Sequence, residues 1–345
     1  MIRRSTLLLA AALVAASCGS AKPPAGTADT TITLVTHDSF YVTDGIFDAF
    51  TKQSGITVKV AQGADAGVVL NQAILAAGKP EGDVLWGVDN TLLSRAVKAK
   101  VFVPYTSPGL ADADQAARAL VGDGIATPVD KGDVCVNIDA EWFATQGLTA
   151  PTSIDQLTQP EYKNLMVVQN PATSSPGLAF LLATIAKFGN EAWLDYWKQL
   201  RANGVLVVDG WTAAYQTEFT RAKGGTRPIV VSYGSSPAAE VSADGPTPTK
   251  ALFDACFRQI EFAGILRGTK HEAAARQVID FLLSDTFQAD MPPNMYVYPI
   301  RKNVPIPDSF RSAGGQAFEP LTVAPAKIDS NREAWIKAWS DLMLG

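Results

Sequence analysis

The stretch DVLWGVDNTLLSRAVK, residues 83–98, indicates the fold class of this chain. Its first part, Asp83–Val88, is an almost unbroken apolar run, which is typical of a strand buried on both faces in a parallel sheet. Asp89 and Asn90 follow as capping residues and begin a predicted helix over Thr91–Lys98. A buried strand that leads directly into a helix is the repeating unit of α/β proteins.

The same alternation precedes this stretch. We expect strands at Thr31–Thr36 and Ile56–Val60 and helices at Gly45–Ser54 and Val68–Ala77, with a glycine after each helix. Together these elements predict an α/β domain with a parallel sheet. Polar residues follow the strands, at the edge where ligands of open α/β sheets bind. They are His37-Asp38-Ser39, Asp65 and Asp89-Asn90.

A second α/β region begins near residue 129. Its expected strands and helices cover Leu165–Gln169, Glu191–Ala202, Trp211–Lys223, Pro228–Tyr233, Cys256–Phe262 and Lys270–Leu283, and a loop with two exposed tyrosines covers Asn294–Pro299. The sequence Ser-Ser-Pro begins a helix twice, at 174–176 and at 235–237. In the second copy Ser236 suits the N-cap and Pro237 the first helical position. Two such helix ends that converge would present several N–H groups to one ligand.

Two aromatic stretches lie close together in the second region. In Asp209–Tyr215, Trp211 and Tyr215 are four residues apart and therefore share one helix face. In Ser232–Pro237, Tyr233 ends a strand just before the helix start. Aromatic faces, hydroxyls and free N–H groups in one place suit a flat, cationic small molecule. The alternative is that Trp211 and Tyr215 are core residues of an amphipathic helix.

The N-terminus predicts export. Two arginines precede the apolar stretch Leu7–Ala16, which is too short to span a bilayer as a mature helix, and small residues then lead to Cys18. This pattern resembles the lipobox of bacterial lipoproteins. We therefore expect a signal peptide over residues 1–17, a lipid on Cys18, and a flexible tether over residues 18–30 that holds the protein to the outer face of the cytoplasmic membrane or in the periplasm. The alternative is an ordinary cleaved signal with an incidental cysteine.

Composition excludes some classes of protein. With 47% hydrophobic and 18% charged residues, the chain can bury a large core and is not disordered. The formal net charge is -5, and loss of the two arginines in residues 1–17 lowers it to about -7. This charge argues against nucleic-acid binding and suits a cationic ligand. About 315 residues follow the tether, which suggests two lobes.

If Cys18 carries lipid, Cys135 and Cys256 are the remaining cysteines. Two cysteines in an exported protein commonly form a disulfide. Both lie in runs that are typical of strands, so a bridge would join neighbouring strands. The alternative is two buried free thiols.

Several motifs of enzymes and metal sites are absent from the sequence. There is no Gly-x-Ser-x-Gly, no phosphate-cradling glycine-rich loop with its lysine, and no His-Glu-x-x-His. Only His37 and His271 are present, which leaves little material for a histidine triad or a multi-histidine metal site. We therefore expect no catalytic activity, metal or cofactor.

Several motifs are specific in combination and span nearly the whole chain from Thr31 to Leu342. They are Thr36–Phe40, Gly87–Leu93, Thr173–Gly177, Gly210–Tyr215, Ser232–Pro237, Tyr298-Pro299 and the helical run Ala273–Ser284 followed by Phe287-Gln288. On these motifs the chain resembles the type II extracellular solute-binding proteins of ABC importers, and among them the thiamine-binding group.

The resemblance implies an α/β, two-lobed periplasmic-binding-protein type II fold. Each lobe would hold a mixed, mostly parallel sheet flanked by helices, and crossing strands that carry the two cysteines would join the lobes. Lobe 1 would comprise residues 31–128 and 256–303, and lobe 2 residues 129–255 and 304–345. Such a protein is a monomer that captures thiamine, or its phosphate esters, between the lobes and delivers it to the permease of an ABC transporter.

The resemblance also implies the ligand-binding residues. They are Asp65, Ala66, Ser174, Ser175, Trp211, Tyr233, Gly234, Ser235, Ser236, Pro237 and Tyr296, with Asp38, Tyr41, Asp89 and Tyr215 as additional contacts. Tyr296 stands where the family has a tryptophan, and His37 where a tyrosine is more usual. The thiazolium ring of thiamine is a permanent cation, so its burial needs aromatic faces or a carboxylate, for which Asp38, Asp65, Asp89 and Asp209 are candidates. A phosphate tail would suit the helix N-termini.

Other functions remain open on the sequence. A ferric-ion-binding protein of the same superfamily would want two adjacent tyrosines, which this chain lacks. A polyamine- or aminophosphonate-binding protein is a further alternative. An exported enzyme is another, although no nucleophile–base pair stands out.

Overall fold

The computed structural model describes residues 30–122, 124–241, 247–313 and 318–345, and its strands join in a single sheet. The strands are Thr30–Thr36 (β1), Ile56–Gln62 (β2), Val84–Asp89 (β3), Phe102–Val103 (β4), Thr127–Asp139 (β5), Met166–Gln169 (β6), Leu206–Val208 (β7), Ile229–Tyr233 (β8), Thr249–Leu266 (β9) and Tyr298–Pro299 (β10). Their order is β2-β1-β3-β9-β5-β8-β6-β7, with β4 beside β9 and β10 beside β5.

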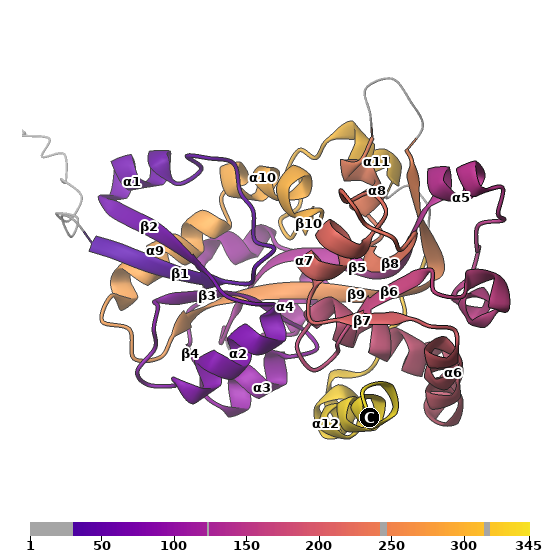
Figure 1. The fold of residues 1–345 in the computed structure, drawn as a ribbon. Helices are drawn as coiled ribbons and strands as arrows, with labels where there is room; N and C mark the ends of the chain where they lie inside the picture. The colour runs from indigo at the N-terminus through magenta and orange to yellow at the C-terminus, as the bar shows by residue number, and fades with distance from the viewer. Residues whose placement is uncertain (1–29, 123, 242–246, 314–317) are drawn as a thin grey trace, which may run out of the picture.

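Helices cover both faces of this sheet (Figure 1). They are Asp48–Ser54 (α1), Ala66–Leu75 (α2), Leu93–Lys98 (α3), Gln115–Ala119 (α4), Ala140–Gln146 (α5), Ser175–Ala202 (α6), Trp211–Ala213 (α7), Ser236–Ala239 (α8), Glu272–Leu282 (α9), Asp285–Met295 (α10), Asp308–Ala313 (α11) and Pro325–Met343 (α12). In the view of Figure 1, α2, α3, α6 and α12 lie below the sheet, and α10 lies above it.

The sheet contains two sets of parallel strands. β1 pairs in parallel with β2 and β3 at one end, and β6 pairs in parallel with β7 and β8 at the other. The long strands β5 and β9 run antiparallel between the sets and pair with each other from Thr127 opposite Ala263 to Asp139 opposite Thr249. Figure 1 shows both strands crossing the middle of the molecule. The predicted fold, two α/β regions connected by crossing strands, is confirmed, and the lobe boundaries stay a prediction.

The burial of the strands follows their sequence pattern. β1 alternates, and its Ile32, Leu34 and Thr36 side chains are fully buried. Every residue of β3 is buried, as expected for an apolar strand in the interior of a sheet covered on both faces. β3 pairs with β1 on one side and with β9 on the other. The residues that follow β1 therefore lie near the middle of β9.

The structure differs from the predicted elements in several places. The helix that starts at Trp211 passes into a π-helical turn, Ala214–Glu218, and ends there rather than at Lys223. The expected helix over 191–202 is the second half of α6, separated from the first by a kink at Gly189, whose φ is 79°. β9 begins at Thr249, before the expected start at Cys256, because the segment already pairs with β5.

Two further differences concern residues near the aromatic stretches. The N-cap of α8 is Ser235, and Ser236 is the first helical residue. The expected loop after Asn294 is partly regular: Asn294 ends within α10, and Tyr298 begins β10. Tyr296 and Tyr298 are partly buried rather than exposed, because Tyr296 packs against Trp211 and Tyr298 packs against Phe310.

A disulfide joins Cys135 on β5 to Cys256 on β9. The register of the two strands shifts between Val134 and Val136, and Cys135 lies at this shift. Residues 1–29 lie outside the described residues, so the signal peptide, the tether and the lipid on Cys18 stay predictions. Among the helices that the structure does describe, none is long and apolar enough to cross a membrane.

Candidate functional site

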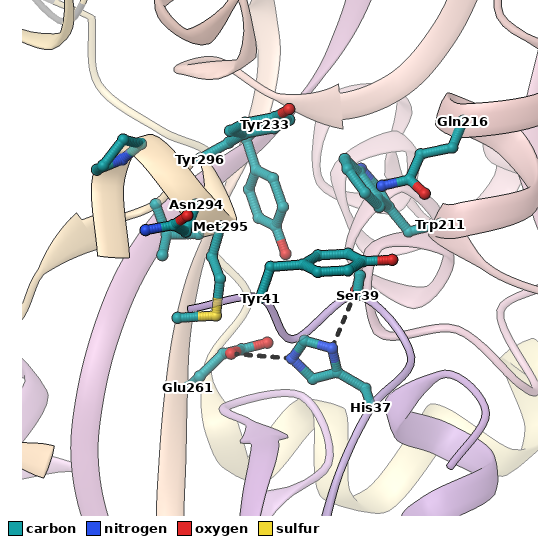
Figure 2. A pocket seen from close by; sticks show the side chains of 12 residues that line it. His37, Ser39, Tyr41, Trp211, Gln216, Tyr233, Glu261, Asn294, Met295 and Tyr296 are labelled. Atoms are coloured by element: carbon teal, nitrogen blue, oxygen red, sulfur yellow. Dashed lines mark hydrogen bonds and ion pairs between the residues drawn. The ribbon is translucent and has the colours of Figure 1, made fainter. Parts of the chain in front are cut away.

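A cavity of about 400 Å³ lies where the ends of β1 and β8 approach the middle of β9, the last turn of α10 and the residues that follow it. Its lining residues are His37, Ser39, Tyr41, Trp211, Gln216, Tyr233, Glu261, Pro293, Asn294, Met295, Tyr296 and Val297. Figure 2 shows the rings of Trp211, Tyr233 and Tyr296 at one end of the cavity and His37 with Glu261 at the other. The volume is in the range of small-molecule binding sites.

Trp211 is held in a fixed orientation. Its ring stacks on that of Tyr215, with centroids 4.8 Å apart and planes 10° from parallel, as the four-residue spacing predicts. The ring of Tyr296 forms a T-shaped contact with it, with ring centroids 6.0 Å apart. The indole N–H donates to Oγ of Ser232, 2.9 Å away. The indole is therefore fixed against the cavity before any ligand arrives, which lowers the entropic cost of binding a flat ring.

The turn after β8 supports the aromatic residues from behind. Oγ of Ser236 hydrogen-bonds to Oγ of Ser232 at 2.8 Å and accepts the backbone N–H of Tyr233 at 3.2 Å. The hydroxyl of Ser235 donates to the carbonyl of Tyr296. Ser235 and Ser236 are buried, and neither lines the cavity. Their contacts connect the stretches that carry Trp211, Tyr233 and Tyr296.

Asp65 caps three helices at once. It is the N-cap of α2, where its carboxylate accepts the N–H of Ala66 at 2.6 Å. The same carboxylate accepts the N–H of Ser175 at 3.1 Å and that of Trp211 at 2.9 Å, at the starts of α6 and α7. Burial raises the pKa of Asp65, and the N–H of Trp211 acts in the opposite direction. The carboxylate of Asp65 thus occupies the start of α6, which is one of the two helix N-termini that the sequence offered to a ligand.

Asp89 has a similar structural environment. Its Oδ1 accepts the N–H groups of Thr91 and Leu92 at 2.9 and 3.0 Å, and its Oδ2 accepts the hydroxyl of Ser175. Burial raises the pKa of Asp89 to about 6. Oγ of Ser174 accepts the N–H of Gly177 at 3.3 Å and so caps α6. These side chains hold helices in place.

Glu261 is the carboxylate that reaches the cavity. It extends from β9 and accepts the indole N–H of Trp86 at 3.2 Å and the amide of Gln259 at 3.2 Å. Nε2 of His37 lies 3.6 Å from its Oε2 (Figure 2). Burial alone would raise the pKa of Glu261, but the His37 imidazole lowers it below the usual range.

His37 is oriented from its other ring nitrogen. Oγ of Ser39 hydrogen-bonds to Nδ1 at 2.9 Å, so Nε2 is directed at Glu261 (Figure 2). Burial would lower the pKa of His37, but the carboxylate of Glu261, together with those of Asp65 and Asp38, more than offsets this and the pKa is raised. At pH values below this raised pKa, an imidazolium and a carboxylate therefore face each other at the polar end of the cavity.

Asp130 lies directly opposite Glu261 on the neighbouring strand β5. Neither of its carboxyl oxygens accepts a hydrogen bond from any residue that the structure describes. Burial and the neighbouring Glu261 carboxylate hold the pKa of Asp130 well above its usual range. Since like charges directly opposite on a sheet repel, the pair carries one negative charge, on Glu261.

The structure separates the residues predicted to bind ligand into two groups. Trp211, Tyr233, Tyr296 and Tyr41 line the cavity. The other predicted residues lie outside its lining: Asp38, Asp65, Ala66, Asp89, Ser174, Ser175, Tyr215, Gly234, Ser235, Ser236 and Pro237. Tyr215 stands behind Trp211 and donates its hydroxyl to Glu240. For this second group a direct ligand contact stays a prediction.

Sequence reasoning missed Glu261 and did not include His37 among the ligand contacts. A signal for Glu261 was present, because it is a lone charge in the otherwise apolar run Ile260–Leu266. A buried charge in such a strand requires a partner or a function. His37 stood among the polar residues that follow β1, but its partner on β9 is more than two hundred positions away.

Comparison with known proteins assigns the chain to a family. The model of the bacterial extracellular solute-binding proteins matches residues 80–318. The chain belongs to this family. A thiamine-binding periplasmic protein of Brucella suis biovar 1 (strain 1330) is 28% identical over 323 residues, which cover 92% of this chain and 93% of that protein. The thiamine-binding periplasmic protein of Escherichia coli (strain K12) is 27% identical over 320 residues, 89% and 92% of the two chains.

A solved structure of a periplasmic thiamin binding protein has the same fold. Its TM-score is 0.79 at 24% identity, and the match covers 92% of this chain and 99% of that one. The type II periplasmic-binding-protein fold and the resemblance to the solute-binding proteins are thereby confirmed. The relatives bind solutes in the periplasm, and the family gives this chain a solute-binding role of the same kind.

Proposed function

We propose that this protein captures thiamine in the cavity beside Trp211 and delivers it to the permease of an ABC importer. The observation that carries the proposal is the composition of the cavity wall. Its tryptophan and tyrosine side chains share the wall with one carboxylate, Glu261, and no Lys or Arg stands among its described lining residues. These aromatic side chains are Tyr41, Trp211, Tyr233 and Tyr296. The names of the relatives, which bind thiamine, point to the same ligand.

The chemistry of thiamine fits this wall. The thiazolium ring cannot lose its charge by releasing a proton, so a buried site must stabilise a cation. Each aromatic face contributes about 0.5–2 kcal/mol to holding such a cation. The aminopyrimidine needs hydrogen-bond partners, and Ser39, Gln216 and Asn294 offer them from the cavity wall.

Thiamine itself suits the cavity better than its phosphate esters. Of the two helix starts that the sequence offered to a phosphate, that of α6 already donates to Asp65. A phosphate near Glu261 would meet a like charge. We therefore propose that affinity falls in the order thiamine, thiamine monophosphate, thiamine diphosphate.

The predicted lobes give the proposal a mechanism. His37, Glu261 and Tyr296 belong to predicted lobe 1, and Trp211 and Tyr233 to predicted lobe 2. We propose that the lobes close on the ligand by rotation about β5 and β9, and that the Cys135–Cys256 disulfide keeps these strands together during the rotation. A lipid on Cys18 would hold the protein at the membrane, near the permease; mass spectrometry of the protein isolated from membranes tests this modification.

Titration calorimetry with thiamine, its two phosphate esters, spermidine and ferric citrate tests the proposed function. We expect one thiamine per chain and the order of affinities given above. Heat with spermidine or ferric citrate, and none with any form of thiamine, would assign the protein to another ligand of the same superfamily. Chromatography with light scattering, with and without thiamine, checks the expected monomer.

A further inference from the structure

We propose that Glu261 selects the positive charge of the ligand, and that the ligand takes the place of the His37 proton as the counter-charge of this carboxylate. Binding would then release a proton and favour a permanent cation over an uncharged molecule of the same shape. The inference rests on the proposed function, because it takes thiamine as the ligand. It adds the residue that recognises the charge and the proton that leaves.

The first support is the position of Glu261. It is the one carboxylate among the described residues that line the cavity. Two of the four carboxylates chosen from the sequence are engaged elsewhere: Asp65 accepts three N–H groups, and Asp89 accepts two N–H groups and two hydroxyls. The other two, Asp38 and Asp209, do not line the cavity. A cation in this cavity therefore has Glu261 as its nearest full negative charge within the lining.

The second support is the pairing of Glu261 with His37. The imidazole Nε2 is 3.6 Å from the carboxylate and is oriented by Ser39, and both side chains line the same cavity. The carboxylates of Glu261, Asp65 and Asp38 raise the pKa of His37 against the effect of burial, so the free protein keeps a proton there to a higher pH than an ordinary histidine would. A thiazolium beside Glu261 would lower the pKa of His37 again, because the thiazolium and a His37 imidazolium next to one carboxylate would repel each other.

The third support is the neutral state of Asp130. Its carboxyl faces Glu261 across the sheet and, with its pKa well above the usual range, keeps its proton. The other titratable groups that face the pair are Asp38 and Asp65 beside His37, and Asp89 and Tyr233 beside Glu261. The carboxylates among them favour a cation in the cavity, either an imidazolium or a thiazolium, and Tyr233, whose pKa is raised well above its usual value, is uncharged.

The sign of the pH dependence follows from linkage. If thiamine binding lowers the pKa of His37, the complex holds fewer protons than the free protein at any pH between the two values. The affinity for thiamine therefore rises with pH up to the pKa of His37 in the free protein and is level above it. The rise approaches tenfold per pH unit, about one proton released per ligand.

Calorimetry at pH 6.5 in two buffers of different ionisation enthalpy counts the released protons. This pH is the ordinary value for histidine, below the raised pKa of His37. The matched probe is the thiophene analogue of thiamine, which keeps the aminopyrimidine but replaces the charged nitrogen with carbon. We expect proton release with thiamine and none with the thiophene analogue.

Three variants separate the roles. Glu261→Gln should weaken thiamine binding about tenfold or more, change binding of the uncharged analogue by no more than about twofold, and abolish proton release. His37→Gln should bind thiamine with no proton release and no pH dependence. Glu240→Gln neutralises a carboxylate near Tyr215 that does not line this cavity, and should behave as wild type.

Each outcome decides a different claim. Wild-type protein that binds thiamine without releasing a proton, or Glu261→Gln that binds it as tightly as wild type, would overturn the inference and leave the proposed function standing. Wild-type protein that binds no thiamine would overturn the proposed function, and the inference with it. If Glu261→Gln does not fold, as judged by its thermal unfolding, the proton count of His37→Gln decides the inference.

Discussion

Two buried acidic regions lie close to one cavity, and they differ in what their oxygens contact. Asp65 and Asp89 are surrounded by hydrogen-bond donors from the starts of helices. Glu261 and Asp130 face each other on neighbouring strands, one lining the cavity and the other without a hydrogen-bond donor among the described residues. A carboxylate satisfied by backbone N–H groups stabilises the fold. A carboxylate that faces a cavity and a titratable neighbour is available for a ligand.

The largest expected effect separates the regions by stability. Asp65→Ala leaves the N–H groups of Ser175 and Trp211 without their acceptor and removes the cap of α2, so we expect a loss of about 3 kcal/mol or more in the free energy of unfolding. Asp114→Ala is the control, because it removes the cap of the short, partly exposed helix α4 and should cost about 1 kcal/mol. Urea unfolding measures both. Equal losses would show that Asp65 is an ordinary cap.

Much of the fold could be predicted from the sequence, because the patterns that specify it are local. The apolar run at Asp83–Val88 and the alternation in β1 determine which faces are buried. The spacing of Trp211 and Tyr215 correctly predicted that their rings share one face. The predicted boundaries were wrong where tertiary contacts act, as in the π-helical turn after Ala213 and the early start of β9.

The two acidic regions could not be distinguished from the sequence. Asp65 gains its partners from residues 110 and 146 positions away, so nothing local shows that its oxygens are occupied. The opposition of Glu261 and Asp130 depends on the register of two long strands, which shifts twice along their length. The resemblance to known binding proteins supplied aromatic positions correctly placed at the cavity but gave no carboxylate within it.

A second prediction uses the pKa of Asp89, about 6, to sharpen the contrast. Because this pKa is raised above the usual 3.8, folding binds a proton between these values and the wild type loses stability as pH rises through the window. Asn imitates the protonated side chain. The free energy of unfolding of Asp89→Asn minus that of the wild type should therefore increase by about 1.4 kcal/mol per pH unit between pH 4 and 6. Above pH 6 this difference should stay constant. Urea unfolding across this range measures the difference, and a pH-independent difference would contradict it.

A third prediction concerns ligand binding alone. Trp211→Ala removes an aromatic face that is fixed by Tyr215 and Ser232, so thiamine affinity should fall about 10- to 100-fold. Trp142→Ala, in helix α5, changes a tryptophan outside the cavity lining and should leave the affinity unchanged. Calorimetry measures both. Unchanged affinity in the first variant would remove the aromatic wall from the site.

The smallest expected effect is that of Tyr215→Phe. The ring that stacks on Trp211 remains, and only the hydroxyl bonded to Glu240 is lost. Thiamine affinity should stay within about threefold of wild type, and stability should fall by about 1 kcal/mol. Fluorescence titration and thermal unfolding check the two values. A loss of affinity as large as that of Trp211→Ala would make Tyr215 a direct ligand contact.

A crystal structure of the protein with thiamine bound tests the central claim most directly. The account predicts the thiazolium ring in the cavity against Trp211, with the carboxylate of Glu261 as its nearest negative charge and Asp65 still bonded to the N–H groups of Ser175 and Trp211. Thiamine that contacts the carboxylate of Asp65 instead, with Glu261 still paired to His37, would contradict it.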